Sequence, residues 1–118
     1  MGAMCSSNKK EKVTVCDTKV AGELHSASVS YNCFGIQALA RHLKLNVKEV
    51  EVGFTATGLD TKRPEFIAMN PHHTIPTYKD NSGSTFWEGN AILRHLARGG
   101  DPSLEGRTEK ERCMVDCL

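Results

Sequence analysis

Proline and glycine residues divide the second half of the chain into short elements, which limits the folds open to it. Pro64 suits the first position of a helix, and Pro71 ends that helix because the residue before a proline is pushed out of the helical region. Residues 80–83, Asp-Asn-Ser-Gly, form a turn signal between apolar runs at 75–78 and 85–87. The sequence therefore predicts a short helix followed by an antiparallel hairpin.

Apolar periodicity predicts the elements of the first half. Residues 30–45 carry apolar side chains at the spacing of one buried helix face. Valine alternates with glutamate in residues 47–52, which indicates a strand, and residues 23–29 are interpreted as an earlier strand. Residues 53–62 are predicted to be a polar loop, and residues 13–15 are a candidate short extra strand.

Two more helices are predicted near the end of the chain. One begins at residue 88, runs to residue 98 and is stopped by residues 99–102, Gly-Gly-Asp-Pro. A Thr-x-x-Glu capping box at residues 108–111 then opens a helix that still continues at Leu118. The order β-α-β-α-β-β-α predicts an α/β fold, in which helices pack on a mixed sheet.

Length, charge and cysteine content exclude several classes of protein. With 118 residues the chain has room for one domain, and its net charge of +1 gives no broad surface for nucleic acid. The five cysteines are an odd number without a Cys-x-x-Cys pair, which speaks against a disulfide framework or a metal site. No secretory signal or apolar run of about 20 residues is present, so free thiols in the cytoplasm are expected.

Three segments resemble one known family. Residues 63–77, Arg-Pro-Glu-Phe-Ile-Ala-Met-Asn-Pro-His-His-Thr-Ile-Pro-Thr, are similar to a stretch of insect-type glutathione transferases. Residues 86–97 contain Trp-Glu-Gly-Asn-Ala-Ile, similar to the family's Trp-Glu-Ser-x-Ala-Ile, and residues 30–33, Ser-Tyr-Asn-Cys, are similar to its serine-type turn. The chain thus resembles the N-terminal domain of serine-type glutathione transferases of the delta, epsilon and theta classes.

The resemblance implies a thioredoxin-like fold with a four-stranded mixed sheet and a division of the chain into three parts. Residues 1–22 are then a polar arm, and residues 23–100 are the thioredoxin-like domain that binds glutathione as substrate, without a metal. Residues 101–118 are a linker and the first helix of an incomplete helical domain. In the family that second domain binds much of the electrophile, so this chain alone is expected to be a weak or inactive transferase.

The resemblance also implies the glutathione-binding residues. Pro76 matches a cis-proline that exposes the backbone of Ile75 to the cysteinyl part of glutathione, as in strand addition. Glu88 matches an acidic residue that holds the γ-glutamyl ammonium, and His73 matches a histidine that faces the glycyl end. Gly89 replaces the family's serine, and losing a hydrogen bond to a charged group costs roughly 1.5–3 kcal/mol. At the next position Asn90 stands where delta members carry arginine.

Ser30 is the catalytic candidate. In serine-type members this hydroxyl donates a hydrogen bond to the glutathione sulfur, which favours the thiolate. An N-cap is the alternative role, because serine is favoured there. Tyr31 and Cys33 are the other candidates, and Cys33 is expected to be half-buried rather than reactive.

The sequence leaves other functions and assembly states open. One alternative is a non-catalytic interaction domain, favoured by Gly89 and the missing domain, and another is a redox protein using Cys33. Apolar side chains of the helices over 30–45 and 88–98 would face the missing domain, so a homodimer is expected where that domain is absent.

The first residues suggest a lipid anchor. Met1-Gly-Ala-Met-Cys-Ser fits the pattern for myristoylation at Gly2, and Cys5 is a candidate for palmitoylation. The pattern therefore predicts a domain held at the cytoplasmic face of a membrane, and the alternative is a Gly-Ala-Met remnant of a cloning site.

Overall fold

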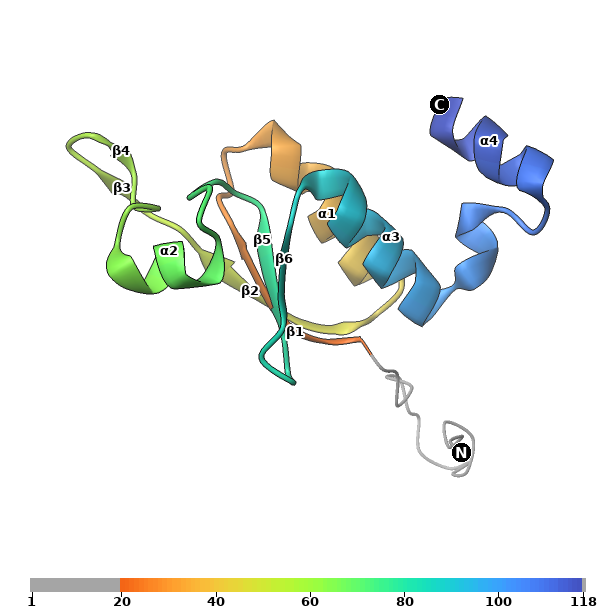
Figure 1. Ribbon diagram of the computed structural model, residues 1–118, viewed down its shortest axis with the longest axis horizontal. Helices are drawn as coiled ribbons and strands as arrows, with labels where there is room; N and C mark the ends of the chain where they lie inside the picture. Colours follow the sequence, from red (N-terminus) through yellow and green to blue (C-terminus); the bar gives the residue numbers. More distant parts are fainter. Residues whose placement is uncertain (1–19, 118) are drawn as a thin grey trace.

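A four-stranded mixed sheet forms the centre of the computed structural model, which describes residues 20–117 (Figure 1). Its strand order is β2-β1-β5-β6, and β1 runs parallel to β2 but antiparallel to β5, which pairs antiparallel with β6. The strands are β1 (Ala21–Ser26), β2 (Asn46–Glu51), β5 (Thr77–Asp80) and β6 (Thr85–Trp87). The thioredoxin-like mixed sheet predicted from the sequence is confirmed.

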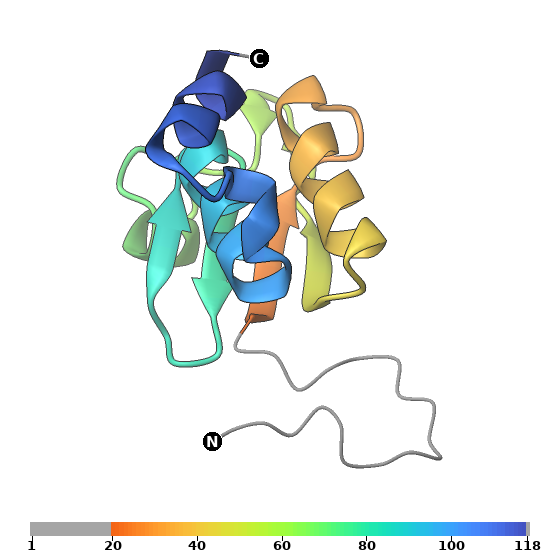
Figure 2. The ribbon, with the colours of Figure 1, turned by 90° about the vertical axis from the view of Figure 1, so that its right-hand side faces the viewer.

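Helices cover both faces of this sheet. Helix α1 (Tyr31–His42) and helix α3 (Gly89–Gly100) run side by side on one face, and α2 (Pro64–Met69) lies on the other side of the strands (Figures 1 and 2). Successive side chains of a strand point to opposite faces, and β1 follows this rule. Leu24 joins the core under α1 and α3, whereas the His25 ring meets Phe66 of α2 edge-on, with 6.2 Å between the ring centroids.

The main core joins the two long helices to the inner strands. Its fully or nearly fully buried members come from α1, α3, β1, β5 and the residue before β1, and they are Val20, Leu24, Ile36, Ala40, Tyr78, Ile92 and Leu96. The helical members follow the i, i+4 spacing that the sequence predicts for a buried face. Burial of this apolar surface fixes α1 against α3.

Helix α3 ends within the predicted stop at residues 99–102, but it runs two residues beyond the predicted end at residue 98 and includes both glycines. The last turn of α3 contains Gly99 and Gly100, and Asp101 is the C-cap residue. A Cβ atom on Gly99 would lie 1.8 Å from Cγ2 of Val20, and one on Gly100 would lie 2.8 Å from Cδ1 of Leu43. These glycines allow the last turn of α3 to approach neighbouring side chains more closely than any larger residue could.

Several element bounds also differ from the prediction. Helix α1 ends at His42 rather than at residue 45, because Lys44 has a positive φ of 55°. The segment predicted to be a polar loop contains a two-stranded antiparallel ribbon, β3 (Phe54–Thr55) and β4 (Gly58–Leu59). The side chain of Thr55 accepts a hydrogen bond from the backbone of Thr57, which holds the tight turn between these strands.

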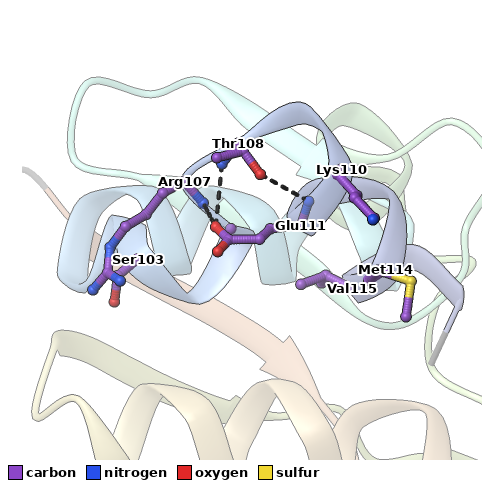
Figure 3. A pocket seen from close by; sticks show the side chains of 8 residues that line it. Ser103, Arg107, Thr108, Lys110, Glu111, Met114 and Val115 are labelled. Carbon is purple, nitrogen blue, oxygen red and sulfur yellow. Dashed lines mark hydrogen bonds between the residues drawn. The ribbon is translucent and has the colours of Figure 1, made fainter.

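The last part of the described chain contains a 3-10 helix, η2 (Pro102–Glu105), and helix α4 (Glu109–Cys117). The predicted capping box is confirmed (Figure 3). The N–H of Glu111 donates to Oγ1 of Thr108 at 3.1 Å, and the N–H of Thr108 donates to Oε2 of Glu111 at 3.2 Å. Helix α4 has no buried side chain. Ion pairs of Arg94 with Asp116 and with Glu105 tie α4 and η2 to α3.

Some of the sequence predictions fall outside the part that the structure describes. Gly2 and Cys5, with their predicted acylation, and the candidate strand at residues 13–15 precede residue 20. Within residues 20–117 no helix is long and apolar enough to cross a membrane.

An aromatic cluster lies between the sheet and α3. The rings of Tyr78 and Phe86 stack with 6.1 Å between centroids, and the His95 ring lies 5.3 Å and 4.9 Å from them. The Tyr78 hydroxyl and Nε2 of His95 are buried without a hydrogen-bond partner among the described residues. Burial raises the pKa of Tyr78 to about 12, and the nearby Asp80 carboxylate adds to this shift.

Burial also lowers the pKa of His95 below its ordinary value of 6.5; Asp80 opposes this shift and Arg98 adds to it. On lowering the pH, the His95 side chain therefore becomes protonated at a higher pH in the unfolded chain than in the folded chain. We therefore expect the free energy of unfolding to fall as pH drops through 6.5 towards the lowered pKa of His95. Urea unfolding between about pH 7.5 and 5.5 measures this loss, which His95→Phe should reduce. An equal loss in both proteins would contradict the assignment.

Candidate functional site

The loop between α2 and β5 carries the predicted cis peptide bond, which the structure shows between Ile75 and Pro76. Pro76 is buried and Ile75 is half-buried. The strand pairing of β5 begins only at Thr77. Neither the N–H nor the C=O of Ile75 has a hydrogen-bond partner in residues 20–117, so both are available to a ligand.

Asn70 holds this loop in place, although sequence analysis treated it only as part of a helix stop. Its side chain is fully buried, and its amide nitrogen donates to the Thr74 carbonyl at 3.0 Å and to Oγ1 of Thr77 at 2.9 Å. Its amide oxygen accepts the N–H of His72 at 2.9 Å. Asparagine before proline favours such a turn, and this signal could have identified Asn70.

The start of α3 forms the second part of the site. Glu88 occupies the N-cap position with φ 80° and ψ 118°, a conformation that residues other than glycine rarely adopt. Its side chain is exposed and has no ion pair among the described residues. Gly89 follows in the first turn, where backbone N–H groups lack partners inside the helix and favour an anion. A carboxylate and an anion-binding helix start are therefore adjacent.

A cavity of about 470 Å³ joins the loop to this helix start. It brings together five of the predicted site residues, Ile75, Pro76, Glu88, Gly89 and Asn90. Asn32, Gly35 and Ile36 of α1, together with Thr74 and Leu93, complete its lining. Sequence analysis gave no binding role to Asn32 or Gly35, because only the packing of α1 against α3 places them there.

Ser30 and His73 lie outside the lining of this cavity. Ser30 occupies the N-cap position of α1 and is half-buried, but its hydroxyl makes no capping hydrogen bond. His73 is exposed in the Asn70–Thr77 loop, where its N–H donates to the Asn70 carbonyl at 2.8 Å. The roles predicted for Ser30 and His73 thus stay predictions.

The alternative candidates of α1 have different surroundings. Tyr31 is 80% exposed, whereas Cys33 is fully buried at the third position of the helix. The expectation that Cys33 is half-buried is wrong, because its side chain is buried on the same face of α1 as Ile36 and Ala40. A thiol without access to solvent is a poor candidate for redox chemistry.

A second groove of about 460 Å³ adjoins the cavity and shares Asn90 and Leu93 with it. Its other walls come from α1, α3, η2 and α4, and its apolar side chains are Leu39, Leu93, Ala97, Leu104 and Val115. Arg94, Glu105 and Asp116 line it as well. The described part of the chain therefore places an apolar groove beside the polar cavity.

Comparison with known proteins gives one consistent family. The model of the "Glutathione S-transferase, N-terminal domain" matches residues 21–98. "Glutathione S-transferase D7" of Anopheles gambiae is 39% identical over 56 residues, which are 46% of this chain and 25% of that protein.

Solved structures agree with this match. A theta class glutathione S-transferase of Xanthomonas axonopodis pv. citri with glutathione bound is 30% identical, with a TM-score of 0.72 over 82% of this chain and 45% of that chain. The Bombyx mori glutathione transferase BmGSTD1 is 30% identical, with a TM-score of 0.73 over 85% of this chain and 46% of that chain. This chain thus spans less than half the length of these relatives.

Asn70→Ala should lower the free energy of unfolding by roughly 2–4 kcal/mol, because it removes the hydrogen bonds of a buried amide and leaves their partners unpaired. Urea unfolding followed by circular dichroism measures this change. Asn81→Ala is the matched control, because Asn81 lies exposed in the turn between β5 and β6. Equal stability of the two variants would contradict the role given to Asn70.

Proposed function

The chain belongs to the glutathione S-transferase family through its N-terminal domain, and on this premise we propose that the cavity between α1, α3 and the Ile75–Pro76 loop binds glutathione. One observation carries the proposal: this cavity gathers Ile75, Pro76, Glu88, Gly89 and Asn90 from two separate segments of the chain. The glutathione bound in the theta class relative supports it.

The cavity and the Asn70–Thr77 loop beside it offer a complementary group for each part of the tripeptide. The free N–H and C=O of Ile75 pair with the cysteinyl backbone, as in the addition of a strand. The exposed Glu88 carboxylate takes the γ-glutamyl ammonium, and the N–H of Gly89 takes the γ-glutamyl carboxylate at the positive end of α3. His73 approaches the glycyl end from the same loop that Asn70 holds.

Ser30 is proposed to act on the glutathione sulfur. Its hydroxyl is not engaged in helix capping and can donate a hydrogen bond to a ligand. A hydrogen bond to the thiolate lowers the pKa of the thiol, and the start of α1 adds positive potential in the same sense. The resulting thiolate is the nucleophile that attacks a small electrophile, while Ser30 itself keeps its proton.

Transfer by this chain alone is proposed to be weak. The apolar groove beside the cavity is where an electrophile would be held. One of its walls is α4, which has no buried side chain and is therefore weakly held, so this wall is expected to hold a ligand loosely. A loosely held electrophile spends little time aligned with the thiolate, and alignment is a large part of catalysis.

A non-catalytic interaction domain is the second candidate function. The apolar groove formed by Leu39, Leu93, Ala97, Leu104 and Val115 favours it, because such a surface suits association with another protein or a second copy. Gly89, which lacks the hydroxyl of the family's serine, favours it too. Glutathione titration separates the candidates, because the interaction domain needs no glutathione affinity.

Gly89→Ser should strengthen glutathione binding by roughly tenfold or more, because a hydroxyl adds a hydrogen bond to the ligand's carboxylate. The space is present: a Cβ atom on Gly89 meets only Cδ1 of Ile36 at 3.8 Å and the Asn32 carbonyl at 4.0 Å. The fluorescence of Trp87, the only tryptophan, reports binding next to Glu88. Glu88→Gln should weaken glutathione binding, because it removes the negative charge that pairs with the γ-glutamyl ammonium.

Gly53→Ser is the matched control for this titration, because Gly53 lies in open space away from the cavity. It should bind glutathione as the unchanged protein does. Absence of binding at millimolar glutathione, both in the unchanged protein and in Gly89→Ser, would contradict the proposed site.

Ser30→Ala should raise the pKa of the bound glutathione thiol and leave the glutathione affinity nearly unchanged, because the hydroxyl interacts with the sulfur and not with the charged ends of the ligand. The ultraviolet absorbance of the thiolate, followed against pH with saturating glutathione, measures this pKa. Ser28→Ala, two residues away and exposed, is the control. An unchanged thiolate titration in Ser30→Ala would exclude Ser30 from the catalytic role.

A further inference from the structure

Helix α4 presents two exposed thiols, Cys113 and Cys117. They are four residues apart, so they lie on the same face of the helix, one turn from each other. A pocket of about 570 Å³ between η2 and the start of α4 is lined on the α4 side by Lys110, Glu111, Met114 and Val115 (Figure 3), and the apolar groove is lined by Val115 and Asp116. Neither cysteine lines this pocket or the groove. The two thiols therefore share a face that points away from η2 and α3.

The spacing of this pair decides which chemistry it suits. Residues four apart in a helix have Cβ atoms about 5–6 Å apart, whereas a disulfide needs about 3.5–4.5 Å. A direct disulfide within α4 would therefore distort the helix. An atom that bridges the two sulfur atoms removes this conflict, because two bonds, each about as long as the ~2.3 Å of a Zn–S bond, span the wider gap.

The acidic neighbours of the pair are already engaged in ion pairs. Glu109, one turn before Cys113, pairs with Arg112 at 3.8 Å, and Asp116 pairs with Arg94 of α3. Residues 20–117 contain no group of three or more histidine, cysteine, aspartate or glutamate side chains that could hold a metal ion. The pair thus lacks the four-ligand shell of structural zinc and suits a soft acceptor that needs two sulfur ligands.

We propose that Cys113 and Cys117 form a dithiol site for thiophilic acceptors of the trivalent organoarsenic class. The capping box at the start of α4 and the Arg94–Asp116 ion pair hold the helix that presents both thiols. In the reaction an arsenic(III) oxide R–As=O accepts two thiols, two As–S bonds form, the As=O bond breaks, and the two thiol protons leave with the oxygen as water. No electrons are transferred, and the site does not depend on glutathione binding.

Phenylarsine oxide, added at one equivalent to the full chain, tests the proposal. Native mass spectrometry should show one arsenic atom bound per chain. This adduct should persist in excess glutathione, because a monothiol competes poorly with a chelate. A small dithiol should remove it. Cys113→Ser and Cys117→Ser should each lose the persistent adduct. A variant with Cys5→Ser and Cys16→Ser should keep it, which assigns the adduct to α4.

The matched control keeps the number of thiols and changes only their spacing. Met114→Cys combined with Cys117→Ser places thiols at neighbouring positions about 100° apart around the helix, because Met114 is also exposed. This variant should lose the persistent adduct while its circular dichroism stays unchanged. Retention of arsenic by this variant or by Cys113→Ser, or no persistent adduct in the unchanged protein, would overturn the proposal.

Discussion

The packing of α1 against α3 is the interaction on which the site depends. Ile36 and Ala40 of one helix and Ile92 and Leu96 of the other bury their side chains over Leu24 and Tyr78. This contact places the start of both helices at the same end of the sheet, where Ser30 and Glu88 occupy the N-cap positions of α1 and α3. The cavity forms between these two helix starts and the loop that Asn70 holds. The N-termini of α1 and α3 thus present positive potential to a negatively charged ligand, and the buried contact between the two helices fixes their positions.

Local signals made most of the fold predictable from the sequence. Pro64 and the Thr108–Glu111 capping box each act within one turn, and the structure shows both helices where these residues place them. The prediction that Ile75, Glu88 and Gly89 lie in one site came from a family resemblance and not from the spacing of these residues. The features that sequence analysis missed depend on distant partners: Gly99 faces Val20, and Asn32 reaches the cavity only because α1 packs on α3. A single sequence contains no signal for contacts between residues that are far apart along the chain.

Glu88 and Gly89 are adjacent, but backbone strain lies at Glu88, whereas the missing hydroxyl group lies at Gly89. Glu88 adopts a positive φ of 80°, the conformation in which glycine would be the unstrained residue. The glycine stands instead at position 89, where the cavity leaves ordinary contact distances for a Cβ atom. The fold therefore does not require glycine there. A glycine in place of the family's serine therefore changes only the hydrogen bonds offered to a ligand.

Helix α4 is held differently from the rest of the domain. No side chain of α4 is buried, and its link to α3 is the Arg94–Asp116 ion pair, in which both side chains are partly exposed. Exposed ion pairs contribute at most about 1 kcal/mol and weaken with salt. Segments with little buried apolar surface open locally long before the core unfolds. The cavity at Gly89 rests on the core and persists through such openings, whereas the apolar groove needs Val115 of α4 in place. In the proposed function, binding of glutathione and retention of an electrophile would therefore depend on parts of the molecule with different stability.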